Sequence, residues 1–576
     1  MTYVISWQIL LYFKQNNLHL YVKIIAVIIH MNNPKQTYNK LFLKYVAPNA
    51  SYFWSTKQPL VWLFSLIIGV AVAYTAIIFR HYIGYIQFAW VGETSEIFFD
   101  KLADVPLYLR ISVPTFGGLL VGLIVYYAAP NKRPEGVADV IGARAKGTAY
   151  ISLRHGFANI IAAGLTLGIG GSAGREGPIV HFGASLASVL ARFINIPPSS
   201  RRSLFGAGVA AAVTASFNAP IAGVLFALEV ILGHFAVAAF VPIVIASVVA
   251  TLIVRHHLGD FPGFIIPEYN ISSFWEFPAF ALLGVVSAIT AIGFQTNVRL
   301  FDKLANMVKI HDIIRPAIGG FIIAIMSLFV PEILGIGYEA TNKALQGDYT
   351  LAFLFILLFS KTIAVAVTLA SRLVGGVFSP ALYIGAMSGG AFGLLASMAF
   401  PELASDTGLY AIIGMGAVAA AILGAPISTV LIVFELTADY SITIALLLSV
   451  SIATGISQAV QGQSIFHWQL TNKGIYLDRG SHRQIARNVT ILDVIDRCDP
   501  TPFDPVEYED SPTLTLDSTL EDAIKKFGAF TNCDEMAVVE TDKDSDEKTI
   551  IGYVSHIRAL QIYNYALIAT NIEEHN

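Results

Sequence analysis

Glu176 stands between two long apolar runs, in the segment Gly174-Arg175-Glu176-Gly177-Pro178. The runs cover residues 160–170 before the segment and 179–190 after it. An ionisable side chain at membrane depth is unfavourable and usually has a function, so Glu176 is the first candidate for a functional residue. Pro178 suits the first turn of a helix, and glycines let a ligand approach the backbone. We therefore expect a helix to begin in mid-membrane with Glu176 at its tip.

The free N–H groups at such a helix end carry a partial positive charge and bind anions. A second segment of the same kind, Gly375-Gly376-Val377-Phe378-Ser379-Pro380, lies about 200 residues further on. Few fixed positive charges accompany these segments, which favours an anion held weakly enough to be released. Glu176 then fits as a mobile competitor that fills the anion site when deprotonated and leaves it when protonated. Tyr440 offers a phenolic hydroxyl as a further donor.

The composition is that of a polytopic helical membrane protein. The chain has 576 residues, of which 55% are hydrophobic and 13% charged, whereas a soluble protein has about 25% charged residues. Apolar stretches fill most of residues 60–460, and many reach the roughly 20 residues that a membrane-spanning helix needs. The excess of Lys and Arg in the loop after the second apolar span predicts that this loop and both termini are cytoplasmic.

The distribution of charge divides the chain into a basic membrane part and an acidic tail. Residues 484–576 hold 19 Asp and Glu against seven Lys and Arg, and both cysteines, Cys498 and Cys533, lie there. This suits a cytosolic appendage. We expect a cytoplasmic segment at 1–55 with translation starting at Met31, a transmembrane domain at 56–462, a linker at 463–487 and a small α/β domain at 488–576.

The tail pattern predicts a strand at 513–515 and a helix at 519–530 capped by Asp517 or Ser518. Further strands are expected at 536–539 and 550–554, followed by a helix at 557–566.

The membrane part contains an internal repeat. The eleven residues 219–229 and 425–435 both read A-P-I-x-x-V-L-x-x-x-E. Paired hydrophobic segments interrupted by glycine and proline are the sequence mark of a transporter site between two structural repeats. We place the repeats at roughly 56–256 and 275–462. Glu229 and Glu435, which close the two copies, are expected to form salt bridges near helix ends.

The two glycine segments, together with Tyr440, resemble the signature segments of the CLC family of chloride channels and proton/chloride antiporters. The resemblance runs from about residue 60 to 460. It implies a homodimer of inverted-repeat protomers, an all-α fold in which broken helices meet at mid-membrane, and a separate pore in each protomer. Glu176 would be the gating glutamate. The implied anion-binding residues are Gly174, Arg175, Gly177, Val377, Phe378 and Tyr440, and the helix-end residues are Pro178, Gly376 and Pro380.

Two positions depart from the pattern of the family. Its first motif is matched best by residues 134–139, where Glu135 and Gly136 stand in place of an anion-coordinating serine turn. Antiporters of the family typically carry a second glutamate after the position of Glu229, and this chain has Val230 there. Because valine cannot carry a proton, the resemblance favours a channel, with a proton-coupled chloride antiporter as the alternative.

The tail resembles one CBS-type regulatory module, so adenine nucleotide is a conceivable ligand there, and no cofactor is otherwise required. Residues 170–174 also fit G-x-S-x-G, which leaves an intramembrane serine hydrolase using Ser172 as a distant alternative. His181 and His234 have no partner at ligand spacing, so no metal site is expected. The expected partners are chloride, protons, lipid and a second copy of the chain, without nucleic acid. The expected location is the plasma (inner) membrane.

Overall fold

The computed structural model describes residues 53–54, 57–94, 99–146, 149–194, 196–259, 264, 267, 269, 271, 273–477, 489–502, 512–530, 533–541 and 548–575. The expected start at Met31, nearly all of the expected N-terminal segment 1–55 and part of the linker lie outside these residues.

The described membrane part consists of helices and the loops that connect them. The first half contains α4 (Gln58–Val91), α5 (Phe99–Leu102), α6 (Leu107–Ala128), η2 (Pro130–Lys132), α7 (Val137–Ala145), α8 (Leu153–Gly168), α9 (Glu176–Phe193), α10 (Pro198–Phe217), α11 (Pro220–Phe226), the π-helical turn η3 (Ala227–Leu232) and α12 (Val237–Leu258). The second half contains η4 (Phe274–Glu276), α13 (Phe277–Met307), α14 (Arg315–Phe329), η5 (Pro331–Ile333), α15 (Tyr338–Leu345), α16 (Leu351–Ala370), α17 (Phe378–Ala399), α18 (Thr407–Leu423), α19 (Pro426–Thr437), α20 (Tyr440–Gln461) and α21 (Ile465–Thr471).

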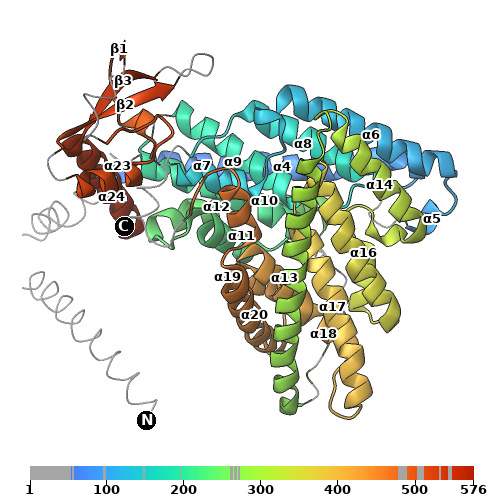
Figure 1. Cartoon of the computed structure of the whole chain (residues 1–576). Helices are drawn as coiled ribbons and strands as arrows, with labels where there is room; N and C mark the ends of the chain where they lie inside the picture. The colour runs from blue at the N-terminus through green and yellow to red at the C-terminus, as the bar shows by residue number, and fades with distance from the viewer. Residues whose placement is uncertain are drawn as a thin grey trace, which may run out of the picture. The chain divides into compact units, whose positions relative to one another are not determined.

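The second half repeats the first helix by helix. The helices α8, α9, α10, α11 and α12 are followed in the same order by α16, α17, α18, α19 and α20. The packing repeats as well, because α10 packs against α9 and α12, and α18 packs against α17 and α20. Figure 1 shows α13, α17, α18 and α20 of the second half running alongside one another. The internal repeat expected from the sequence is therefore a repeat of structure.

Seven helices within the described residues are long and apolar enough to cross a membrane. They span Gln58–Val91, Leu107–Ala128, Val237–Leu258, Phe274–Met307, Leu351–Ala370, Phe378–Ala399 and Tyr440–Thr471. Large apolar side chains on their surfaces remain exposed, such as Ile289 at 64% and Leu252 at 64%. Exposed apolar surface of this extent marks a protein that faces lipid. The chain is a multi-pass membrane protein.

The tail is a small α/β unit. Its sheet has the order β1-β3-β2, made of β1 (Asp496–Pro502), β2 (Glu535–Thr541) and β3 (Lys548–Ser555), all antiparallel neighbours. The helices are α23 (Leu520–Ala529) and α24 (His556–His575), with the turn η6 (Ile491–Asp493) before β1. The core packs apolar side chains of the helices against the sheet, among them Leu520, Phe527, Val538 and Val554.

Two expectations for the tail are corrected by the structure. The expected strand at 513–515 is a single bridge between Leu514 and Val538, while β1, with its two prolines, was not expected. Thr519, rather than Asp517 or Ser518, caps α23, because its hydroxyl accepts from the N–H of Asp522 and the Asp522 carboxylate accepts from the N–H of Thr519 in return. This is a capping box.

Thr519→Ala is expected to lower the free energy of unfolding of the tail by about 1 kcal/mol, the usual effect of losing such a cap. Hydrogen bonds from Thr519 hold the pKa of Asp522 below its ordinary value. A depressed aspartate pKa stabilises the fold fully above about pH 4, the unfolded value, and the gain is lost as the pH falls through the lower folded value. Limited proteolysis of the full-length protein should show roughly fivefold faster cleavage of the tail in the variant at neutral pH. Equal rates would contradict the capping role.

Candidate functional site

The two glycine segments meet and pair with each other. The N–H of Gly174 donates to the carbonyl of Gly376 and the N–H of Gly376 donates to the carbonyl of Gly174, both at 2.7 Å, in an antiparallel bridge. Helix α9 begins two residues after the first glycine and α17 two residues after the second. The first-turn N–H groups of both helices, one from each half, are thereby brought together in the interior. The expected helix start at Glu176 is confirmed.

Proline occupies the same place in both helices. Pro178 and Pro380 are each the third residue of their helix, in the first turn, where proline's missing N–H removes no intrahelical hydrogen bond. The backbones can approach because no side chain intervenes: a Cβ on Gly376 would lie 2.9 Å from the N atom of Gly177, and one on Gly177 3.0 Å from Cα of Gly376. The glycines are therefore required by the contact between the repeats.

Glu176 reaches across to the first turn of the other repeat's helix. Its side chain is buried, and Oε1 accepts a hydrogen bond of 2.5 Å from the hydroxyl of Ser379, the second residue of α17. Oε2 has no hydrogen-bond partner among the described residues. A Cβ built on Gly174 would lie 2.5 Å from Oε2 and 3.2 Å from the N atom of Ser379, so the carboxylate sits beside that helix end. Sequence reasoning named the segment of Ser379 but gave this hydroxyl no role.

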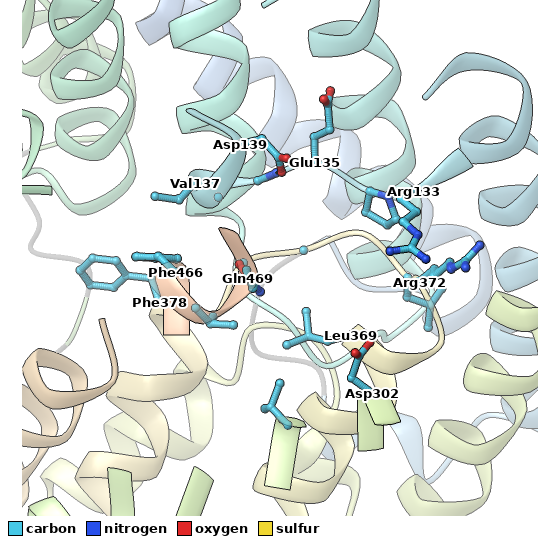
Figure 2. Close-up of a pocket in the computed structure, with 18 of the residues that line it drawn as sticks. Arg133, Glu135, Val137, Asp139, Asp302, Leu369, Arg372, Phe378, Phe466 and Gln469 are labelled. Atoms are coloured by element: carbon cyan, nitrogen blue, oxygen red, sulfur yellow. The ribbon is translucent and has the colours of Figure 1, made fainter. Parts of the chain in front are cut away.

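A cavity opens on one side of Glu176, and we call it the central cavity. Its wall includes Glu176, Gly177, Gly376, Val377 and Phe378. Figure 2 shows Phe378 and Phe466 close together at one end and the guanidinium groups of Arg133 and Arg372 close together at the other. An anion inside would thus find helix ends and apolar rings at one end and cations toward the other.

Tyr440 is not part of this cavity, which corrects the sequence expectation. It is the first residue of α20, its side chain is 74% exposed, and it is not among the residues that line the central cavity. Phe226, Phe466 and Trp468 join Phe378 in the wall, and Phe466, on the short helix α21, is 3% exposed. A phenyl ring has no hydroxyl, so this position supplies no O–H donor to an anion. Tyr440 was expected there because its side chain carries a hydroxyl.

Arg175 faces a second cavity rather than the central one. That cavity is lined by Arg175, Phe217 and Tyr338, among others. The guanidinium is buried, donates to the carbonyl of Ser216 at 3.2 Å and to the hydroxyl of Tyr338 at 3.4 Å, and lies 5.0 Å from the centre of the Tyr338 ring. Arg175 thus lines the second cavity, and the next residue, Glu176, lines the central one.

Aromatic rings separate the cavities. The ring of Phe378 lies 4.8 Å from that of Phe217, which lines the second cavity, and 5.9 Å from that of Phe226, which lines the central one.

Glu135 and Gly136 do reach the central cavity. Both line it, and Gly136 caps helix α7, where its N–H donates to the Asp139 carboxylate at 2.9 Å. The Glu135 carboxylate is in contact with two imidazoles, His181 at 3.2 Å and His155 at 3.8 Å. The sequence gave no indication of the contact with histidine, since the three residues lie on separate segments.

Glu229 and Glu435 each cap the first turn of a helix in the opposite repeat. Glu229 accepts from the N–H groups of Ile427 and Ser428, at 3.0 and 2.8 Å, and from the Ser428 hydroxyl. Glu435 accepts in the same way from the N–H groups of residues 221 and 222, at 3.0 and 2.8 Å. Each glutamate therefore satisfies the first turn of the other repeat's proline-led helix. Val230 follows Glu229 in η3 and is not among the residues lining the central cavity.

The serine of the G-x-S-x-G motif has no surroundings for hydrolysis. A helix, α8, precedes it instead of the strand that a nucleophile elbow needs. The Ser172 side chain is buried and its hydroxyl has no hydrogen-bond partner among the described residues, so no base activates it. The described residues also contain no group of three or more His, Cys, Asp or Glu arranged to hold a metal ion.

The sequence is similar to a family of chloride channels and to chloride transport proteins. The profile of the family described as "Voltage gated chloride channel" matches residues 117–458, more than half of the chain. A ClcB-like chloride channel protein of Ralstonia nicotianae is 31% identical over 390 residues, which cover 66% of this chain and 90% of the relative. The H(+)/Cl(-) exchange transporter ClcA of Vibrio cholerae is 28% identical over 425 residues, 71% of this chain and 89% of the relative.

Two solved structures share the fold of the membrane part. A slow cyanobacterial Cl-/H+ antiporter superposes with a TM-score of 0.64 at 21% identity, covering 72% of this chain and 97% of that one. A eukaryotic CLC transporter superposes with a TM-score of 0.60 at 19% identity, covering 88% of this chain and 89% of that one.

The plant protein CLC-e of Arabidopsis thaliana is 30% identical in sequence, and this chain spans 59% of its length.

Proposed function

This chain belongs to the voltage-gated chloride channel family, and from that premise we propose that it moves chloride across its membrane past the side chain of Glu176. The family consists of channels and transporters, so the protein is not an enzyme. The observation that carries the proposal is the buried Glu176 carboxylate, which is hydrogen-bonded to Ser379 at the first turn of α17 and lines the central cavity.

Chloride is proposed to bind at the converging helix ends. Anions suit this place because the first-turn N–H groups and the helix dipole offer partial positive charge without a fixed cation. The backbones around Gly174, Gly177, Val377 and Phe378 supply these groups, and Phe466 completes the wall in the place where a tyrosine was expected. Arg175 acts from the second cavity as a fixed charge that attracts anions toward the passage.

Glu176 is proposed to be the gate. As a carboxylate it accepts from Ser379 and fills the anion position at α17. Once protonated it has no negative charge to hold there, and chloride takes its place while the side chain moves aside. The passage then opens between the rings of Phe217 and Phe378, and flux rises as the pH falls.

We propose channel-like conduction as the mode of transport, because Val230 puts no carboxylate at the position where antiporters of the family carry their second glutamate. Proton-coupled exchange is the second candidate, favoured by the similarity to the H(+)/Cl(-) exchange transporter of Vibrio cholerae. A reversal potential that follows chloride alone in planar bilayers would support the channel. One that shifts with a pH gradient would support the exchanger.

The test of the proposed function is uptake of radioactive chloride into liposomes that contain the purified protein, at one neutral and one acidic pH. We expect uptake that exceeds empty liposomes and increases at acidic pH. Absence of uptake at both pH values would refute the proposal. Ser172→Ala is expected to retain the flux, whereas labelling of Ser172 by a serine-reactive phosphonate would instead support the hydrolase.

The remaining proposals concern assembly and the tail. We propose a homodimer in the plasma (inner) membrane. We also propose that both termini are cytoplasmic, which the asymmetry of Lys and Arg between the loops supports. The α/β tail is proposed to be a CBS-like regulatory domain in which adenine nucleotide is a candidate ligand. A shift of tail protease resistance on adding ATP would support this, and unchanged resistance at saturating nucleotide would count against it.

A further inference from the structure

Glu135 borders two cavities. Besides the central cavity it lines a neighbouring one, here called the side cavity, whose wall includes Lys146, Tyr150 and His155. Asp139 also borders both, but its carboxylate is bonded to Lys473 and accepts from the N–H of Gly136. Glu135 is therefore the carboxylate on this shared wall that is not committed to a lysine in the described part of the chain.

Two imidazoles face the same oxygen of Glu135. Oε2 lies 3.2 Å from Nε2 of His181 on α9 and 3.8 Å from Nδ1 of His155 on α8. His181 is fully buried, and neither of its ring nitrogens forms a hydrogen bond with a described residue. His155 is 30% exposed and lines the side cavity. Histidine is the side chain that changes charge around neutral pH, so this oxygen is linked to the proton concentration of the side cavity.

The remaining charged groups around Glu135 are held in other contacts or lie at the other end of the central cavity. Arg372 is paired with Asp312 at 2.5 Å, and Arg315 donates to the carbonyl of Ala370 at 2.9 Å. Figure 2 shows the Glu135 carboxylate pointing away from Arg133 and Arg372. The titratable and charged groups on the walls of the two cavities are Arg133, Glu135, Asp139, Lys146, Tyr150, His155, Glu176, Asp302, Arg315, Arg372 and Lys473.

We propose that Glu135 is the proton-exchange group of the central cavity, receiving protons from the side cavity through His155 and releasing them toward Glu176. The inference rests on the proton-coupled form of the proposed function, its second candidate, in which Glu176 gains and loses a proton during transport. It adds the residue that supplies the proton. The packing of η3 against α7 gives a physical reason for the location: Val230 provides no carboxylate, and Glu135 stands at the start of the neighbouring helix α7.

Each step moves one proton and no other atom. The His155 imidazolium gives its Nδ1 proton to the Glu135 carboxylate, which leaves a neutral imidazole and a carboxylic acid. The acid passes the proton to water in the central cavity, the water passes it to the Glu176 carboxylate, and Glu135 is again an anion. His155 regains a proton from the solution. His181 is a positioning residue: its Nε2 lies 3.2 Å from Oε2 of Glu135 and limits where the carboxylate can sit.

The test compares Glu135→Gln with the wild type as full-length proteins in liposomes, measuring chloride efflux with a chloride electrode and proton movement with a pH electrode. We expect proton movement per chloride to fall at least about tenfold, in line with the loss of a proton-transferring group. Asp104→Asn removes an exposed carboxylate that lines neither cavity and is expected to leave proton movement per chloride unchanged. Glu135→Asp should restore part of the proton movement.

His155→Gln provides a second variant in case Glu135→Gln does not fold, because its side chain is partly exposed. We expect it to slow proton movement and to weaken the response of chloride efflux to pH. Unchanged proton movement per chloride in either variant would overturn the inference, as would a wild type whose chloride flux neither carries protons nor responds to pH. Loss of all chloride flux in the wild type would instead refute the proposed function itself.

Discussion

Glu176→Gln is expected to remove the pH dependence of chloride flux and to leave the flux high. Glutamine has nearly the shape of a protonated glutamate, so it carries no charge that could fill the anion position at α17. The flux of the variant at neutral pH should match that of the wild type at acidic pH, and the ratio between the two pH values should fall to about one. Chloride efflux from liposomes at the two pH values measures this directly.

Ser379→Ala is the companion to this variant. It removes the hydroxyl that donates to Oε1 at 2.5 Å but keeps the carboxyl group. The deprotonated side chain then loses a charge-assisted hydrogen bond, worth about 1.5–3 kcal/mol. Flux at neutral pH should rise while the pH dependence remains. A normal pH response in Glu176→Gln would show that the gate is elsewhere.

Gly174→Ala is expected to reduce chloride flux strongly at both pH values. The added Cβ would lie 2.5 Å from Oε2 of Glu176 and 3.2 Å from the N atom of Ser379, which is the space that the carboxylate fills and that an anion is proposed to share. Overpacking typically costs about 1–3 kcal/mol, equivalent to roughly 5- to 150-fold weaker binding. Initial rates of chloride uptake over a range of chloride concentrations measure the effect.

Gly293→Ala is the matched control for this substitution. Gly293 lies within α13, and a Cβ built on it meets nothing within 4 Å. Alanine also favours the helix, so this variant should transport as the wild type does. Wild-type rates in Gly174→Ala would mean that the space beside Glu176 is not used by the anion.

The sequence predicted the helical membrane fold, the repeat and the start of α9 because each depends on local pattern. Membrane helices need long apolar runs, since the backbone must bond within itself in lipid. Glycine followed by proline limits where a helix can begin. Both signals are contained in short segments, so they can be recognised without knowing which other segments pack against them. Glu135 was named through the resemblance of residues 134–139 to the first motif of the family.

The partners of these residues depend on packing between segments that are far apart in the chain. Ser379 meets Glu176 across 203 residues, and the capping role of Glu229 and Glu435 was not predicted because each side chain reaches the opposite repeat. Tyr440 was chosen for its hydroxyl, but α20 begins with its tyrosine exposed, and α21 brings Phe466 to the cavity instead.

The chain by itself thus determined which residues could carry charge into the membrane and where the helices around them break, since both follow from local chemistry. Only the tertiary structure decided which oxygen faces which donor. Those contacts arise from the antiparallel pairing of Gly174 with Gly376 and from helix packing, and neither a spacing nor a residue type specifies the direction in which a side chain crosses between the two halves.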